Sequence, residues 1–182
     1  MPERIIKFIR EHHLMTLTVL DLSGLEMWPF HAFYAFSPED AFFVISSEEN
    51  TKHIKMLKEN SEYRENSEYH INHATDESHA SLENSENHEN HETHEILENH
   101  QNIVAGGIAL ETKQIALLRG LQFTGVMEPC SESDLDRCRL LYLKRFPFAV
   151  LKMDELWKIT IMQAKLTDNR LGFGTKLLWK KD

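Results

Sequence analysis

The segment AFFVISSEENTKHIKMLKEN, residues 41–60, decides the fold class. It begins with AFFVISS, a short apolar run whose length and composition are typical of a buried strand. The polar residues at 48–50 then suit the start of a helix, and Ile54 and Leu57 are spaced for its inward face. The segment therefore predicts a buried strand that leads directly into an amphipathic helix.

Upstream of this segment, the pattern predicts a short helix followed by a hairpin. Apolar residues recur at near-helical spacing over residues 3–13. A β-rich run at residues 14–20 and an aromatic run ending at Phe36 are separated by Ser23-Gly24, a turn signal. Pro29 predicts a bulge or an edge position early in the second strand, because proline has no backbone N–H to donate.

Downstream, the pattern alternates between strands and one helix. The expected elements are a strand over 102–110, one long strand or two joined at a bulge near Gly120 over 113–129, a helix over 131–146, a strand over 156–169 and a closing segment over 171–182. Mostly sequential strands with few helices predict a mainly β fold, an antiparallel barrel with appended helices, instead of a doubly wound sheet.

Residues 61–101 interrupt this pattern with a low-complexity insertion rich in His, Glu and Asn. The chain of 182 residues suits a single domain, 1–182, that carries such an insertion. Residues 61–100 hold 11 of the 29 acidic residues and one of the 20 basic residues, so their net charge is −10 and the remainder carries +1. A near-neutral remainder argues against nucleic acid as the main partner.

The insertion also holds seven of the eleven histidines. Among them His88, His91 and His94 recur every three residues, so on a helix they drift by about 60° per step and align imperfectly for a metal. The metalloprotease spacing His-Glu-x-x-His is absent. These three residues are weak metal candidates, and a solvated loop without a function is the alternative.

The sequence holds few signals that indicate where in the cell the protein is located. No apolar run approaches the roughly 20 residues of a membrane helix, and the N-terminus has no signal-peptide order. Cys130 and Cys138 are expected to be free thiols in a chain that is not secreted. We therefore expect a cytoplasmic protein with no membrane partner.

The segments on both sides of the insertion carry a resemblance. HAFYAF (31–36), the segment 41–60 and the strands over 102–129 are similar to the pyridoxamine 5'-phosphate oxidase-like FMN-binding split-barrel superfamily. The ending KLTDNRLGFGTKLLW (165–179) resembles the uncharacterised bacterial YhbP-like proteins. The resemblance implies an antiparallel split β-barrel, a homodimer, and an FMN groove at the dimer interface. It also implies a short connection where this chain has its insertion.

Site residues follow from the resemblance, position by position. Arg119 stands where the true oxidases have an Arg-Gln pair, which here is Arg119-Gly120, so the expected amide is missing. The implied cofactor-binding residues are His31, Ala32, Phe33 and Tyr34 behind the ring, Ser46, Ser47, Thr51, Lys52 and His53 at the phosphate, and Arg119.

The residue chemistry supports the phosphate assignment independently. A dianion needs several convergent donors and a cation, which hydroxyl groups and Lys52 can supply. A helix that starts near Asn50 adds free N–H groups. Glu48 and Glu49 would repel a phosphate unless they face solvent. The alternative interpretation is an ordinary junction between a strand and a helix.

Three functions remain open from the sequence. The first is FMN binding, with oxidoreductase activity on an unknown substrate. The second is a non-enzymatic binding module in which flavin is lost or replaced by another small planar ligand, such as haem or a deazaflavin. The third is metal binding through the insertion. No catalytic acid or base is assigned, and no nucleophile elbow, P-loop or Rossmann fingerprint is present.

Overall fold

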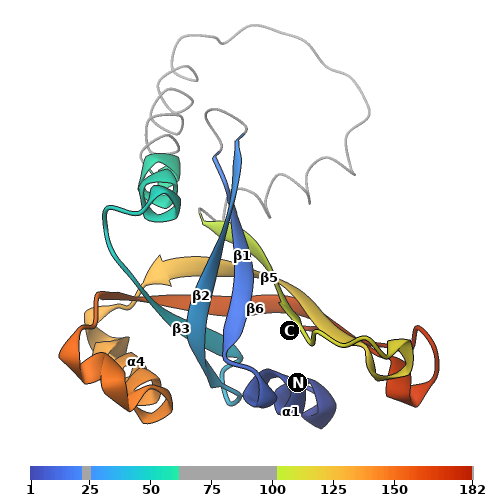
Figure 1. Ribbon diagram of the computed structural model, residues 1–182. Coiled ribbons are helices and arrows are strands. Elements are labelled where there is room, and N and C mark those ends of the chain that lie inside the picture. Colours follow the sequence, from blue (N-terminus) through green and yellow to red (C-terminus); the bar gives the residue numbers. More distant parts are fainter. Residues whose placement is uncertain (22–25, 62–101, 182) are drawn as a thin grey trace, which may run out of the picture.

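The computed structural model describes residues 1–21, 26–61 and 102–181 (Figure 1). The Ser23-Gly24 turn and the histidines His88, His91 and His94 lie outside the described residues. The predictions about them, and about the insertion as a whole, therefore stay predictions.

The described strands form a closed barrel, which confirms the predicted fold class. Neighbouring strands pair antiparallel in the order β3-β2-β1-β4-β5-β6-β7, and β3 also pairs with β6. Six strands therefore close the barrel, and β7 extends the sheet beyond β6. The strands are β1 (Leu14–Leu20), β2 (Met27–Ser37), β3 (Phe42–Ser47), β4 (Ile103–Ala109), β5 (Arg119–Pro129), β6 (Glu155–Asp168) and β7 (Lys176–Lys180).

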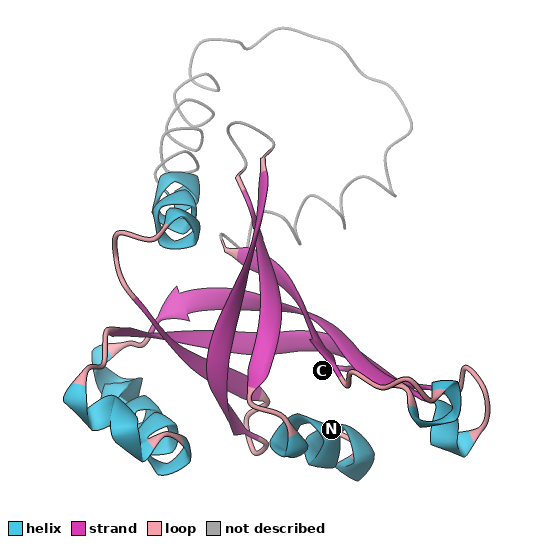
Figure 2. Ribbon diagram, in the orientation of Figure 1, coloured by secondary structure: helices cyan, strands magenta, loops and turns pink. Residues whose placement is uncertain are grey.

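Three described α-helices lie around this barrel (Figure 2). They are α1 (Glu3–Glu11), a helix over residues 52–61, and α4 (Glu132–Arg145). Helix α1 and helix 52–61 lie at opposite ends of the barrel (Figure 1). Short 3-10 turns follow at η1 (Ile115–Leu117), η2 (Pro147–Leu151) and η3 (Asn169–Leu171). None of the described helices is long and apolar enough to span a bilayer.

Strand alternation divides the apolar residues between two cores. Along β1, Met15, Leu17 and Val19 are fully buried while their neighbours are more exposed, as expected for a strand with one inward face. In β3 both faces are buried. Phe43 faces the barrel interior, whereas Val44 belongs to a second cluster against α4. A strand buried on both faces explains the continuous apolar run that opens the segment 41–60.

Two details of the predicted strands need correction. Residues 115–117 form a 3-10 turn, so the strand predicted over 113–129 begins only at Arg119. The bulge lies between Thr124 and Gly125, not near Gly120. By contrast, Pro29 does lie where β2 pairs only with β1, because the pairing with β3 starts at Tyr34.

Strands from both sides of residues 62–101 belong to the same barrel. β1 pairs with β4, and β3 pairs with β6. The interior is therefore built jointly by the two parts of the chain, with Leu17 and Ile45 in the same core cluster as Phe123 and Ile159.

Candidate functional site

Ser47, Thr51 and His53 form one hydrogen-bonded cluster where β3 leads into helix 52–61. The Ser47 Oγ lies 2.8 Å and the Thr51 Oγ1 lies 3.2 Å from His53 Nε2. Thr51 donates its own hydroxyl hydrogen to the Glu48 carbonyl at 2.8 Å, so it can only accept from His53. A proton on Nε2 satisfies both contacts. Among the described residues, the Ser47 hydroxyl hydrogen then has only the long 3.4 Å contact to the Thr51 Oγ1, which a ligand could replace.

The imidazole of His53 is held in a neutral form. It stacks on Phe30 with ring centroids 3.7 Å apart and planes 3° from parallel. Burial lowers the pKa of His53 to about 4, because the charged ring would lose its hydration. At neutral pH this residue therefore offers a hydrogen bond to the cluster and no charge.

Lys52 places a cation beside the cluster. Its Nζ lies 4.1 Å from the centroid of the Trp28 ring and forms an ion pair with Glu26. The side chain is 43% exposed, so an incoming anion can reach the ammonium group. The Trp28 ring contributes an electrostatic attraction that keeps the ammonium at this position.

The two carboxylates that were expected to oppose a phosphate are each paired with a lysine. Glu48 lies 3.0 Å from the Lys152 Nζ, and Glu49 forms an ion pair with Lys58. Hydrogen bonding from Lys58 holds the pKa of Glu49 below its usual value. Both carboxylates are exposed, so water and the lysines screen their charge from the cluster.

Ser46 is not part of this cluster. Successive residues of a strand point to opposite faces, so Ser46 and Ser47 diverge. The Ser46 Oγ accepts the backbone N–H of Asp154 at 3.1 Å. Of the predicted phosphate residues, the structure thus brings together Ser47, Thr51, Lys52 and His53.

The same alternation divides the predicted ring-backing residues of β2. Ala32 and Tyr34 face inward, and the buried Tyr34 hydroxyl donates to the Ile9 carbonyl at 2.8 Å. Burial raises the pKa of Tyr34. His31 and Phe33 face outward, where the His31 Nδ1 lies 3.0 Å from the Thr16 hydroxyl. Of the four ring-backing residues, only His31 and Phe33 could contact a ligand on the outer surface.

Arg119 lies far from the hydroxyl cluster within one chain. Ser47 pairs with Glu155 and Arg119 pairs with Asp168, so the two residues lie near opposite ends of β6, about 40 Å apart along the strand. The Arg119 Nη1 lies 2.8 Å from Glu11, and its buried Nε has no hydrogen-bond partner among the described residues. A ligand touching both groups would need two copies of the chain.

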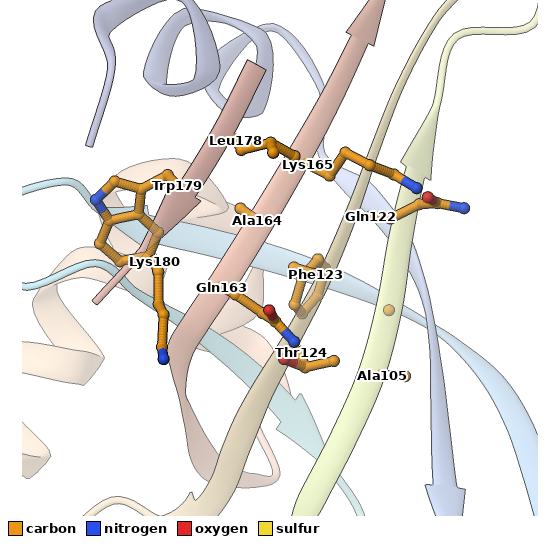
Figure 3. A pocket seen from close by; sticks show the side chains of 11 residues that line it. Ala105, Gln122, Phe123, Thr124, Gln163, Ala164, Lys165, Leu178, Trp179 and Lys180 are labelled. Carbon is orange, nitrogen blue, oxygen red and sulfur yellow. The ribbon is translucent and has the colours of Figure 1, made fainter. Parts of the chain in front are cut away.

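A further concave surface was not foreseen from the sequence. A groove of about 610 Å³ lies over β4, β5, β6 and β7, and its polar side chains include Gln122, Gln163, Lys165 and Lys180 (Figure 3). The polar residues Gln163 and Lys165 in the alternating strand 156–169 were the available signal. Their alignment with residues of β5 and β7 depends on strand register, which the sequence does not show.

The fold and the cluster define a class of protein, a closed antiparallel barrel of the split-barrel type with helices at its ends. No family model matches the chain. Curated relatives are UPF0306 proteins. The chain is 26% identical to one from Yersinia pestis over 175 residues, covering 96% of this chain and 90% of the relative. It is 28% identical to one from Klebsiella pneumoniae over 176 residues, covering 97% and 90%.

Solved structures share the fold at low sequence identity. ChuZ of Campylobacter jejuni superposes with a TM-score of 0.61 and 12% identity, covering 98% of this chain and 58% of that one. A heme binding protein from Mycobacterium smegmatis gives 0.59 and 12%, covering 94% and 54%, so this chain spans about half of its length. A Listeria innocua protein described as a candidate pyridoxamine 5'-phosphate oxidase gives 0.52 and 11%, covering 90% and 95%.

Proposed function

We propose that the chain binds FMN through the Ser47–Thr51–His53 cluster, in a homodimer. One observation carries the proposal: a weakly held hydroxyl hydrogen on Ser47, an accessible ammonium group on Lys52 and the start of a helix lie together at the end of β3. This set of groups suits a phosphate monoester. The resemblance of residues 31–60 and 102–129 to the FMN-binding split-barrel superfamily and the barrel fold support the same assignment.

The phosphate would lie at the start of helix 52–61. The first N–H groups of a helix have no intrahelical acceptor, and the helix dipole favours an anion there. Ser47 would donate its hydroxyl hydrogen to the phosphate in place of its long contact to Thr51, and Lys52 would exchange its contact with Glu26 for the phosphate. Such charge-assisted hydrogen bonds are among the stronger contacts that a protein makes.

The flavin ring would lie on the outer face of β2. On this face Phe33 is 48% exposed, so its ring is available to a planar ligand. When bound, the flavin would supply hydride and electron transfer. The residues of this chain would bind and orient it, and His31 would offer an imidazole at its edge.

A second copy of the chain would complete the site. The outer face of β1, β2 and β4 exposes the large apolar residues Leu14, Met27, Phe33 and Ile103, with Leu14 opposite Phe33 in the β1–β2 register. Large exposed apolar groups on one sheet face are typical of a protein–protein interaction surface. For one ligand to touch both groups, Arg119 of one copy would have to lie beside the cluster of the other in this dimer.

Haem is the second candidate ligand. The exposed His31 engages Thr16 through Nδ1, and its Nε2 has no hydrogen-bond partner among the described residues, so it could ligate iron. The similar fold of the Mycobacterium smegmatis heme binding protein favours the same ligand class, although not the same residues. FMN and haem are both planar. FMN would be anchored through its phosphate at the Ser47–Thr51–His53 cluster, and haem through its iron at His31.

Titrations of the purified chain with FMN and with hemin separate these candidates. We expect FMN to bind with micromolar affinity and Lys52→Ala to weaken it by at least about tenfold. Lys55→Ala is the matched control, because Lys55 is an exposed lysine on the same helix. Absence of FMN binding up to about millimolar concentration defeats the proposal. A hemin spectrum that disappears in His31→Ala would support the second candidate instead.

A further inference from the structure

The groove over β4 to β7 is built from two parallel rows of residues that cross the strands. Strand register places Gln122, Lys165 and Leu178 opposite one another in the first row. It places Thr124, Gln163 and Lys180 in the second row. The Lys165 side chain extends toward Gln122, and that of Gln163 extends toward Thr124 (Figure 3).

The hollow has a structural cause. The β4 neighbours of the two rows are Gly107 and Ala105, which are too small to fill the space beside β5. At the other side, β7 continues the sheet past the closure of the barrel and presents Leu178 and Lys180. The resulting volume of about 610 Å³ lies within the usual size range of small-molecule sites.

The charged side chains that line the groove are all positive. Lys165 and Lys180 line it, no carboxylate does, and neither lysine forms an ion pair within residues 1–21, 26–61 and 102–181. The two lysines lie on adjacent strands in neighbouring rows, so their Cα atoms are about 8 Å apart by sheet geometry. Each lysine has a glutamine as its cross-strand neighbour, Gln122 for Lys165 and Gln163 for Lys180, and their amides add hydrogen-bond donors.

The groove also has an apolar part. Leu178, which is 72% exposed, contributes an apolar side chain. Phe123, Ala164 and Trp179 also line the groove, but they form the row between the two polar rows, and their side chains pack into the barrel core. Apolar lining with a few convergent polar groups is typical of sites that orient an organic ligand. A bare inorganic anion would leave this apolar surface unused.

We propose that this groove binds a small organic anion with an aromatic body and a carboxylate or similar acidic group. The acidic group lies in the groove within reach of the two lysines and the glutamine amides, and the aromatic body covers the exposed Leu178. The site uses none of the residues of the proposed FMN cluster. It therefore does not depend on the proposed function.

Calorimetric titration of the full chain with naphthoate and with its neutral amide, naphthamide, tests this assignment. We expect saturable binding of one naphthoate per chain, with naphthamide weaker by at least about tenfold because it lacks the charge. The double variant Lys165→Gln, Lys180→Gln should weaken naphthoate by at least about tenfold. Lys176→Gln removes an exposed lysine of β7 that does not line the groove, so its affinity should equal that of the unaltered chain.

Two results would overturn the proposal. One is the absence of naphthoate binding up to about 10 mM, and the other is an unchanged naphthoate affinity in the double variant. Binding that Lys52→Ala abolishes would place naphthoate at the FMN cluster. A Leu178→Glu variant that weakens self-association, in a chain that binds no naphthoate, would show that a second copy occupies the groove. FMN titrations of the double variant should be unchanged, so failure of either proposal is distinguishable from failure of the other.

Discussion

At the residue scale, the buried neutral His53 makes stability depend on pH. Its pKa is about 4 in the folded chain and 6.5 without the fold, so only the unfolded state takes up the proton between these values. Stability therefore falls as the pH drops from about 6.5 toward about 4. The linkage predicts a free energy of unfolding about 2 kcal/mol lower at about pH 5 than at about pH 7.

Urea unfolding of the native chain and of His53→Gln at the two pH values measures this effect. The variant loses the titrating ring, so the difference between the two pH values should shrink by about 2 kcal/mol. The carboxylates with a lowered pKa, such as Asp168 with its Arg170 partner, lose their contribution only at still lower pH. An equal pH dependence in both proteins would contradict the assignment of a neutral buried imidazole.

The residues of the cluster could be named from the sequence, but their roles could not. Alternation along a strand already implies that Ser46 and Ser47 point to opposite faces. The sequence does not show which of them faces the helix, because both faces of β3 are buried. The bond between Thr51 and the Glu48 carbonyl, which leaves Thr51 able only to accept from its neighbours, depends on the turn geometry at 48–51.

At the element scale, the bulge between β5 and β6 requires a glycine. A Cβ on Gly125 would lie 2.5 Å from the Thr160 carbonyl oxygen, so the backbone of β6 would have to move. Gly125→Ala should lower the free energy of unfolding by about 2 kcal/mol, measured in urea. In Gly120→Ala the nearest atom is 3.7 Å away, so its stability should change by less than about 0.5 kcal/mol. Equal losses in the two variants would argue against this bulge position.

The strands were predictable where one face is polar and the other apolar, as in β1 and β6. The segment 113–118 was not, because its apolar residues Ile115, Leu117 and Leu118 are 67%, 43% and 42% exposed. Its geometry is set instead by contacts distant in sequence, such as the Asn169 side chain, which donates to the Ile115 carbonyl at 2.8 Å. An apolar run outside the core carries no periodic signal for its structure.

At the scale of the whole molecule, the predicted cofactor residues lie near both ends of the barrel. The resemblance assigns both the cluster around Ser47 and Arg119 to the cofactor. It does not show that these two groups lie far apart within one chain. The separation follows from the long strand β6, whose two ends pair with Ser47 of β3 and Arg119 of β5. Under the proposed function each chain would hold two parts of the site, and this is the physical reason to expect a functional dimer.

The outer face of β1, β2 and β4 is the surface that such a dimer would bury. Leu14→Glu would place a charge opposite Phe33 on this face, and burying an unpaired carboxylate costs several kcal/mol. Sedimentation of the native chain should therefore give twice the chain mass of 21.3 kDa, whereas Leu14→Glu should sediment as a single chain. Leu151→Glu is the control, because Leu151 is 89% exposed on η2 and the dimer should persist.

FMN affinity should fall together with dimerisation in Leu14→Glu. A native chain that binds FMN as a monomer would show that one copy holds the complete site, and Arg119 would then have no role in it.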